Sequence, residues 1–280
     1  TVMSWRGESG GIKSARMGHD VIMTPGNFLY FDFYQADPKT QPYAIGGYTP
    51  VKTVYSYNPV PVDSLDAEQR QHIIGVQANT WTEYINDEKH LEYMMFPRAL
   101  AVAELAWTPQ ELRSWADFKP RMNANIPVLQ RMGINAFTLS DEIEATMTVD
   151  TLKREILVNL DAEKYPAEIR YTTDGTMPTA ASPLYKRPIV VKDSAHVVAA
   201  IFRGGQPQGE PTEKKADYHR GINKPIHYNS KLYSGYMAGG MNALLDGYRG
   251  GLTYLDGRWQ GYLDNLDCVV DMGEVTDLHK

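Results

Sequence analysis

The sequence contains one cysteine, Cys268, among 280 residues. A single cysteine excludes an intrachain disulfide framework, and we expect Cys268 to be a small, buried apolar residue. Apolar runs are also short, and none approaches the roughly 18 residues of a membrane span. The chain has no basic run interleaved with aromatics, and its net charge of −6 argues against a nucleic-acid partner. It also lacks histidine pairs at metal-ligand spacing and a glycine-rich phosphate loop, so we predict no metal and no other cofactor.

The sequence does contain enough apolar and aromatic residues for sizeable cores. Apolar residues make up 42% of the chain, and there are 18 tyrosines and 5 tryptophans. This aromatic content is compatible with carbohydrate-facing surfaces and with all-β domains. The length allows one large domain or two to three small ones. The chain begins at Thr1 within a strand-like motif and shows no signal-like segment, so we expect a fragment whose upstream part is missing.

Residues 1–139 alternate short apolar runs with helical patterns, as β/α repeats do. Strands are predicted at residues 2–5, 20–23 and 73–80. Helices are predicted at residues 10–18, 65–71 with a Ser64 cap, 91–105 with a kink at Pro97, and 118–132 before Gly133. Residues 33–63 hold five prolines and predict a long structured loop, a kind of segment that is usually functional.

The pattern changes after residue 139. Residues 140–215 show short alternating runs at 155–160, 168–173, 189–191 and 196–202, with turns at Asp174-Gly175 and Gly204-Gly205. This pattern predicts a small antiparallel β-sandwich. Residues 216–280 hold further strand-like runs at 243–247, 259–262 and 269–273, and we expect Trp259 to be a core or inter-strand residue rather than a sugar platform.

The stretch from Gly75 to Tyr84 carries the chemistry most clearly, because it ends in the pair Trp81-x-Glu83. Residues two apart on a strand point to the same side, so an indole and a carboxylate can face one pocket. Barrels of the (β/α)8 type place their chemistry at such strand ends. An apolar wall beside a hydrogen-bond acceptor suits a sugar ring. The spacing alone leaves a core tryptophan beside a surface glutamate as an equal alternative.

Further motifs accompany this stretch in a fixed order, and they are Val2-Met3-Ser4-Trp5-Arg6-Gly7-Glu8, Val21-Ile22-Met23-Thr24-Pro25, Leu29-Tyr30-Phe31-Asp32 and Phe96-Pro97-Arg98. Together they resemble the C-terminal half of the catalytic domain of glycoside hydrolase family 20, the β-N-acetylhexosaminidases. The resemblance implies an α/β plus all-β fold: the C-terminal half of a (β/α)8 TIM barrel in residues 1–139, a chitobiase-type β-sandwich in 140–215 and a partial, discoidin-like galactose-binding jelly roll in 216–280.

The same resemblance implies a retaining, exo-acting hydrolase of glycans that end in N-acetylglucosamine or N-acetylgalactosamine. In this family the 2-acetamido group of the substrate is the nucleophile. Tyr30 matches the tyrosine that bonds the acetamido oxygen, and Asp32 and Glu83 match carboxylates that bind the O4 and O6 hydroxyls. Trp5 and Trp81 match walls of the acetamido pocket.

The general acid of the family is a glutamate that directly follows an aspartate, upstream of the motifs found here. The Asp-Glu dipeptides of this chain are Asp87-Glu88 and Asp141-Glu142, and we assign the acid role to neither. Asp87-Glu88 is typical of a helix start, where acidic residues favour the helix dipole. We therefore predict that the fragment alone is inactive. Arg98 and Glu104 are expected to form a structural ion pair.

Two other function classes remain open. A non-catalytic carbohydrate-binding protein could be built on the same folds, and an Asp-Glu pair at a barrel strand end would discriminate in favour of the enzyme. The segment Gly7-Glu8-Ser9-Gly10-Gly11 formally matches a serine-hydrolase elbow but lacks identified His and Asp partners. By family resemblance, the location is expected to be periplasmic, cell-surface or secreted.

Overall fold

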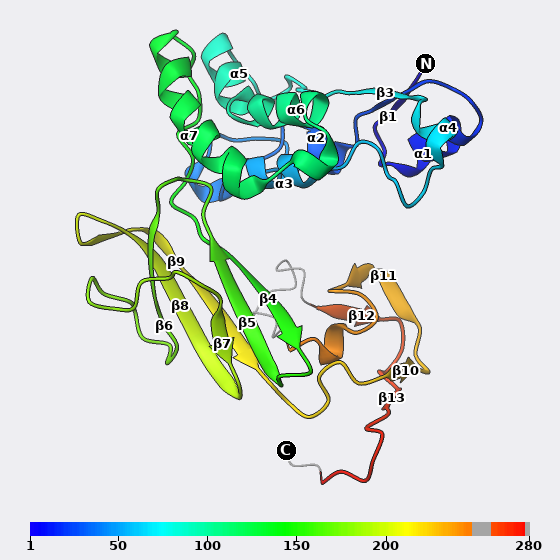
Figure 1. Cartoon of the computed structure of the whole chain (residues 1–280), viewed down its shortest axis with the longest axis vertical. Coiled ribbons are helices and arrows are strands. Elements are labelled where there is room, and N and C mark those ends of the chain that lie inside the picture. The colour runs from blue at the N-terminus through cyan, green and yellow to red at the C-terminus, as the bar shows by residue number, and fades with distance from the viewer. Residues whose placement is uncertain (248–258, 278–280) are drawn as a thin grey trace. The chain divides into compact units, whose positions relative to one another are not determined.

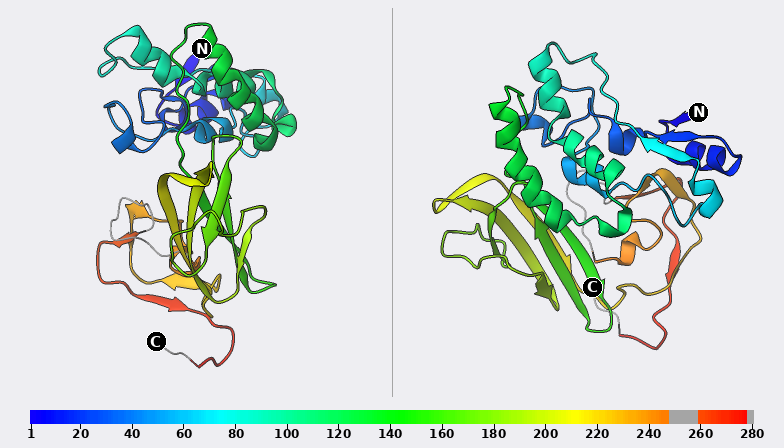
Figure 2. Two further views of the ribbon diagram at one scale, coloured as in Figure 1. Left: turned by 90° about the vertical axis from the view of Figure 1, so that its left-hand side faces the viewer. Right: turned by 45° about the horizontal axis from the view of Figure 1, so that its top comes forward.

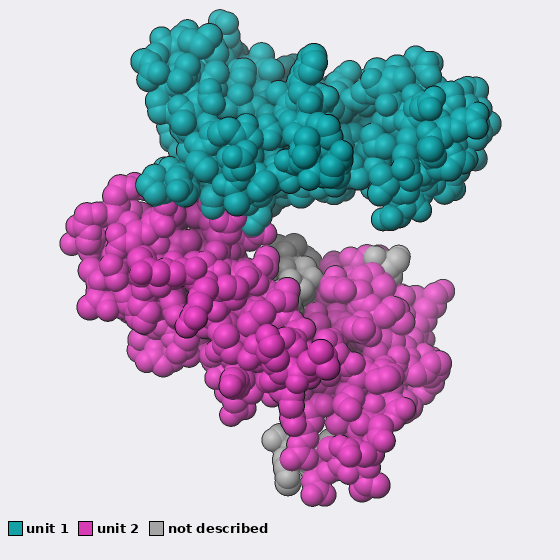
Figure 3. Space-filling view, viewed as in Figure 1, with its two compact units in different colours: residues 1–140, 163–166 teal, residues 141–162, 167–280 magenta. Residues whose placement is uncertain are grey.

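The computed structural model of the chain describes residues 1–247 and 259–277. The chain divides into two compact units (Figure 3). Unit 1 comprises residues 1–140 and 163–166, and unit 2 comprises residues 141–162 and 167–280. The further division of the second part into 140–215 and 216–280 stays a prediction.

Unit 1 is an α/β unit, as predicted. Its strands form a parallel three-stranded sheet in the order β1-β2-β3. Figure 1 shows β1 and β3 beside α1 and α4, whereas α5, α6 and α7 gather at the other end of the unit. The elements in chain order are β1 (Val2–Ser4), α1 (Ser9–Arg16), β2 (Val21–Met23), α2 (Gly26–Leu29), the 3-10 turn η1 (Pro38–Thr40), α3 (Val51–Ser56), α4 (Ala67–Arg70), β3 (Ile73–Val76), α5 (Glu88–Met95), α6 (Arg98–Trp107), the 3-10 turn η2 (Gln110–Leu112) and α7 (Trp115–Arg131).

The core of unit 1 joins the central strand to the helices. Both ends of β2, Val21 and Met23, are fully buried. Helix α7 contributes Phe118, Met122 and Ile126, which recur every fourth residue and therefore form one apolar stripe. All five side chains belong to one continuous apolar cluster. This packing holds the sheet and places its carboxyl-terminal edge, where the predicted site residues follow the strands.

Several local predictions for unit 1 were wrong in detail. The helix expected at 91–105 is two helices, because Pro97 lacks the N–H that would continue the hydrogen-bond ladder. The helix before β3 is capped by Asp66 rather than Ser64, since Asp66 accepts from the backbone N–H groups of Glu68 and Gln69. The segment 33–63 contains α3, and β3 is shorter than predicted, ending at Val76.

Unit 2 is all-β, as predicted. Figure 2 shows the strands of its two antiparallel three-stranded sheets, β4-β5-β7 and β6-β8-β9. The two sheets share one apolar core that includes Val158 and Ala199. The strands are β4 (Glu144–Asp150), β5 (Glu155–Asp161), β6 (Glu168–Thr172), β7 (Ile189–Val191), β8 (Ser194–Arg203) and β9 (Gln206–Asp217). Gly204 and Gly205 form the predicted turn between β8 and β9, both with positive φ. Neither β4 nor β9 was predicted. In β9 polar, charged, glycine and proline residues leave no apolar alternation, whereas β4 does alternate, with Ala145, Met147 and Val149 two residues apart.

The rest of unit 2 consists of short elements: β10 (Ile226–Tyr228), β11 (Leu232–Met237), the 3-10 turn η3 (Ala243–Leu245), β12 (Gln260–Tyr262) and β13 (Cys268–Val270). The run at 243–247, expected as a strand, forms η3 instead. Trp259, expected to be a core or inter-strand residue, is 48% exposed and directly precedes β12, and Cys268 is only half-buried. The predicted jelly roll includes residues 248–258 and 278–280, which lie outside the described residues, and it stays a prediction.

Candidate functional site

The parallel sheet of unit 1 brings the predicted site residues to one edge. Trp5 directly follows β1, and Trp81 and Glu83 lie on the extension of β3. Tyr30 forms an isolated parallel bridge with Asn79 on that same extension. The Phe31 N–H donates to the Asn79 carbonyl at 2.7 Å, and the Asn79 N–H donates to the Leu29 carbonyl at 2.8 Å. These two bonds attach the segment that carries Tyr30 and Asp32 to the end of β3.

A cavity of about 780 Å³ opens at this edge. Its volume lies within the 300–1,000 Å³ typical of ligand pockets. All five predicted site residues line it, and its lining is Met3, Trp5, Thr24, Tyr30, Asp32, Phe33, Ile45, Gln77, Asn79, Trp81 and Glu83. The structure therefore brings together predicted site residues from three separate segments of the chain, while their individual roles stay predictions.

The aromatic side chains form an apolar wall of this cavity. The rings of Tyr30 and Trp81 meet edge to face with centroids 6.2 Å apart, and Phe33 lies 5.7 Å from Tyr30. Trp5 and Trp81 are each about half exposed. The Arg6 guanidinium lies over the Trp5 ring, 4.7 Å from its centroid. The exposed parts of both indoles are available to the C–H groups of a ligand.

The two carboxylates of the cavity differ sharply in exposure. Asp32 is 7% exposed, whereas Glu83 is exposed to solvent. Burial raises the pKa of Asp32, and the negative charge of Glu83 raises it further. The backbone N–H groups of Asp32 and Trp81 and the charge of Arg98 lower the pKa of Asp32 in opposition. Asp32 is thus a buried acceptor whose charged form is disfavoured by its burial.

The sequence analysis missed polar members of the lining. Asn79 donates through Nδ2 to Thr24 Oγ1 at 2.7 Å and accepts at Oδ1 from Gln77 Nε2, also at 2.7 Å. Gln77, Asn79, Trp81 and Glu83 are spaced two apart, so the alternation that singled out the last two would also have found the first two.

Arg98 has a different role from the predicted ion pair with Glu104. Its guanidinium is fully buried and donates to the carbonyl oxygens of Phe31 at 2.5 Å, Phe33 at 3.0 Å and Thr49 at 3.1 Å, and through Nε to Met94 at 3.0 Å. It also stacks on the Phe31 ring, 4.6 Å from the centroid. The carbonyls of Phe31 and Phe33 flank Asp32, so Arg98 fixes the backbone on both sides of that carboxylate.

Glu104 pairs with another arginine. Its carboxylate accepts from Arg121 at 2.6 Å and 3.1 Å. Asp87 and Glu88, in contrast, occupy the predicted helix start. Asp87 is the N-cap of α5 and accepts from the His90 N–H at 2.7 Å, while Glu88 lies in the first turn. Neither member of this acidic pair lines the cavity.

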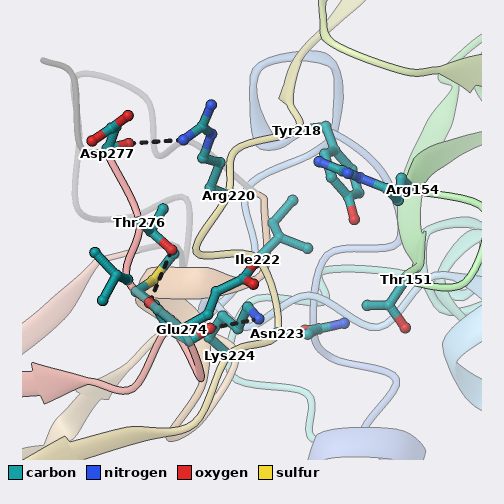
Figure 4. Close-up of a pocket in the computed structure, with 12 residues that line it drawn as sticks. Thr151, Arg154, Tyr218, Arg220, Ile222, Asn223, Lys224, Glu274, Thr276 and Asp277 are labelled. Carbon is teal, nitrogen blue, oxygen red and sulfur yellow. Dashed lines mark hydrogen bonds between the residues drawn. The ribbon is translucent and has the colours of Figure 1, made fainter.

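A second hollow, of about 710 Å³, lies in unit 2 (Figure 4). Polar and charged side chains dominate its lining, among them Arg154, Arg220 and Glu274. The guanidinium of Arg220 donates to the Asp277 carbonyl at 2.8 Å, which ties the terminal segment to the hollow's wall. None of the predicted site residues lies there, so the candidate site is the cavity of unit 1.

The described residues include no candidate metal site and no helix suited to span a membrane. Residues 1–247 and 259–277 contain no group of three His, Cys, Asp or Glu side chains placed to hold a metal ion. Within the same ranges, no helix combines the length and apolar character needed to cross a membrane.

Comparisons with known proteins agree on one family. Residues 1–110 match the model of the glycosyl hydrolase family 20 catalytic domain, and residues 147–213 match that of the chitobiase/beta-hexosaminidase C-terminal domain. A beta-hexosaminidase of Porphyromonas gingivalis is 41% identical over 202 residues, which cover 68% of this chain and 24% of the relative.

Further relatives match shorter segments. A beta-hexosaminidase of Vibrio furnissii is 34% identical over 103 residues, which cover 36% of this chain and 17% of the relative. A solved family 20 exo beta-N-acetylglucosaminidase from Vibrio harveyi is 33% identical, with a TM-score of 0.42 over 48% of this chain and 21% of that structure. The chain spans about a quarter or less of the length of these relatives. The chain therefore carries part of a glycosyl hydrolase family 20 catalytic domain in residues 1–110, followed by a chitobiase/beta-hexosaminidase C-terminal domain in residues 147–213.

Proposed function

We propose that this chain is part of a retaining, exo-acting β-N-acetylhexosaminidase and supplies one side of its substrate pocket. The observation that carries the proposal is the convergence of Trp5, Tyr30, Asp32, Trp81 and Glu83 on one cavity. Two sequence relatives are named beta-hexosaminidases, and this supports glycoside hydrolysis as the reaction class. The substrates are glycans that end in N-acetylglucosamine or N-acetylgalactosamine, and the protein works in the periplasm, at the cell surface or outside the cell.

In this proposal the parallel sheet of unit 1 is the C-terminal half of a (β/α)8 barrel, and residues 216–280 begin a jelly roll. The substrate's 2-acetamido oxygen attacks C1, so the anomeric configuration is retained. The Tyr30 hydroxyl donates to that oxygen while charge develops on the acetamido group. Trp5 and Trp81 enclose the acetamido group, and Asp32 and Glu83 accept from the O4 and O6 hydroxyls.

The proton donor lies outside the described cavity in this proposal. Asp87-Glu88 begins α5, and Asp141-Glu142 follows unit 1, so neither pair lies where a leaving group would be protonated. We therefore assign the general acid to another part of the longer protein. Positioned acid/base groups typically contribute about 10²–10⁴-fold to the rate, so the 280-residue chain alone should not turn over.

The test uses the full-length protein and the 280-residue chain with chromogenic N-acetyl-β-glucosaminide and N-acetyl-β-galactosaminide. We expect hydrolysis by the full-length protein, with the β-anomer of the free sugar appearing first by NMR, and none by the chain. Glu83→Gln should lower kcat/KM roughly 5- to 150-fold, because a hydroxyl ligand loses its charged acceptor. Robust turnover by the chain would contradict the proposal, and sugar binding without turnover by the full-length protein would favour a non-catalytic carbohydrate-binding protein.

A further inference from the structure

A second, very small cavity lies beside the proposed substrate pocket, and the proposed mechanism does not use it. It measures about 10 Å³, and its lining is Asp32, Tyr43, Ala44, Ile45, Trp81, Glu83, Tyr84, Ile85, His90 and Met94. Four residues line both cavities, so the small one adjoins the proposed substrate pocket; they are Asp32, Ile45, Trp81 and Glu83. A volume of about 10–15 Å³ is the room that one water molecule needs.

Two polar atoms of the residues around this cavity are buried without a partner. Asp32 Oδ1 and His90 Nε2 make no hydrogen bond to any described residue. Leaving a buried polar atom unpaired costs about 1–3 kcal/mol, and the great majority of such atoms in folded proteins are paired with protein or ordered water. An acceptor oxygen and an imidazole nitrogen around a space of this size are the surroundings in which a buried water is retained.

The position of His90 follows from local sequence. Asp87 caps α5 by accepting from the His90 N–H, which fixes the first turn of the helix and the direction of its third residue. One turn later, Met94 lines the same cavity, and its carbonyl oxygen accepts from Arg98 Nε. Arg98 in turn holds the carbonyls on both sides of Asp32. Helix α5 thus lines the same small cavity as the Asp32 side chain, and Arg98 binds the backbone on both sides of Asp32.

We propose that His90 is a positioning residue for the sugar-binding carboxylate, acting through a single buried water that bridges His90 Nε2 and Asp32 Oδ1. The inference rests on the proposed function, in which Asp32 binds a hydroxyl of the terminal sugar. The water holds one oxygen of Asp32 in place and leaves the other for the ligand. Met94, which is buried, and Ile85 contribute apolar groups to the lining of this space.

The kinetic test compares variants of the full-length protein. His90→Leu replaces the imidazole with an apolar side chain of similar size and removes the nitrogen, so kcat/KM should fall roughly 5- to 150-fold. The loss should come mainly from a higher KM, because the sugar hydroxyl is bound in the ground state as well as in the transition state. His90→Gln places an amide near the Nε2 position and should restore activity to within about threefold of wild type. Glu88→Gln, an exposed change on the same helix, should leave both constants unchanged.

A double-mutant cycle separates positioning from a general packing defect. On an Asp32→Asn background, His90→Leu should have no further effect on KM, since the group on which it acts has already been altered. An equal loss on both backgrounds would overturn the proposal, and so would failure of His90→Gln to restore KM.

A crystal structure of the full-length protein gives a readout that does not depend on catalysis. It should show one ordered water within hydrogen-bond distance of Asp32 Oδ1 and His90 Nε2, and His90→Leu should lack it. A dry cavity, or a direct bond between the two side chains, would overturn the proposal. If the wild-type protein hydrolyses neither chromogenic sugar, the proposed function fails, and this crystallographic result still decides whether the bridge exists.

Discussion

Tyr30 and Asp32 are two residues apart and line the same cavity, but their polar groups differ in how they would act on a substrate. Tyr30 is half-buried, and its ring is held between Trp81 and Phe33. In the proposed mechanism its hydroxyl bond strengthens as the acetamido oxygen attacks, so it stabilises the transition state more than the ground state.

Tyr30→Phe in the full-length protein should therefore lower kcat more than it raises KM. Removing one donor to a developing charge typically costs about 10²–10³-fold in kcat. Steady-state kinetics on a chromogenic N-acetyl-β-glucosaminide measure both constants. Tyr165→Phe, on a half-exposed tyrosine outside both cavities of unit 1, is the matched control and should change neither. An unchanged kcat for Tyr30→Phe would remove this residue from the mechanism.

The buried carboxyl group of Asp32 should make the stability of the chain depend on pH. Burial raises its pKa in the folded state above the unfolded value. A carboxyl group of this kind favours folding most when protonated, and this stability is lost as the pH rises through the folded pKa. Each unit of pKa increase corresponds to about 1.4 kcal/mol. Asparagine does not titrate, so the stability of Asp32→Asn relative to wild type should increase between pH 3.5 and pH 7.

Urea unfolding of the chain across this pH range measures the difference. Asp174→Asn provides a control of opposite sign, because hydrogen bonds from Thr176 lower the pKa of Asp174. A carboxyl group whose pKa is lowered in the folded state favours folding at pH values above its pKa in the unfolded state. Asp174→Asn should therefore lose stability relative to wild type as the pH rises. If the difference in free energy of unfolding between Asp32→Asn and wild type did not change with pH, burial would not raise the pKa of Asp32.

At the scale of elements, the link between helix α6 and the site depends on Arg98. Its four carbonyl partners belong to three segments, around residues 31–33, 49 and 94, so a single side chain fixes the loop that carries Asp32. Arg98→Met would leave those buried carbonyls without donors and should cost about 3 kcal/mol or more. Arg98→Lys keeps the charge but loses the planar fork, and it should restore only part of the stability.

Chemical denaturation with a probe in unit 1, such as Trp81 or Trp115 fluorescence, measures these losses. Arg121→Met is the control, because Arg121 pairs with Glu104 and Asp117 while half exposed, and such pairs typically contribute about 1 kcal/mol or less. Equal losses for the Arg98→Met and Arg121→Met variants would mean that the carbonyl contacts of Arg98 do not stabilise unit 1.

The elements also show where sequence reasoning worked. Phe118, Met122, Leu129 and Met132 predicted a helix at residues 118–132, which is α7, although Ile126 was not among the residues used. Short apolar runs predicted β5 and β8, and β5 shows the alternating burial of a half-buried strand, whereas β8 is buried at six consecutive residues. The carbonyl contacts of Arg98 could not be predicted, since backbone oxygens carry no sequence signal. The His90–Asp32 relation was missed for a similar reason: 58 residues separate the two positions, and only the fold brings both side chains to one small cavity.

At the scale of the whole molecule, the two units should differ in stability. In unit 1, β1 and β3 are both edge strands of a three-stranded parallel sheet. Parallel sheets are normally covered on both faces, whereas Met3 is 45% and Ile74 is 54% exposed here. Trp107 is 87% exposed as well. These exposed apolar groups are what the proposed half-barrel would leave uncovered.

Unit 2 is built differently, because its two antiparallel sheets enclose their own core. In β8, Val197, Ala199 and Ile201 are buried in this core, and in β5, Ile156 and Val158 are buried in it too. Each of these strands is central in its sheet and paired on both sides. Antiparallel sheets with one covered face are stable without helices on both sides, so this core does not depend on further strands.

Limited proteolysis of the 280-residue chain should therefore degrade residues 1–139 first and leave a resistant piece near residues 141–217. Open strand edges and exposed apolar groups lower the free energy of local opening, and proteolysis follows the population of open states. Mass spectrometry of the early fragments identifies the resistant piece. In urea, the helical far-UV signal, which arises mainly from unit 1, should be lost at a lower concentration than the β signal of unit 2. A single cooperative transition with both units equally protected would mean that unit 1 completes a fold by itself or by pairing with a second copy, and the half-barrel interpretation would then be wrong.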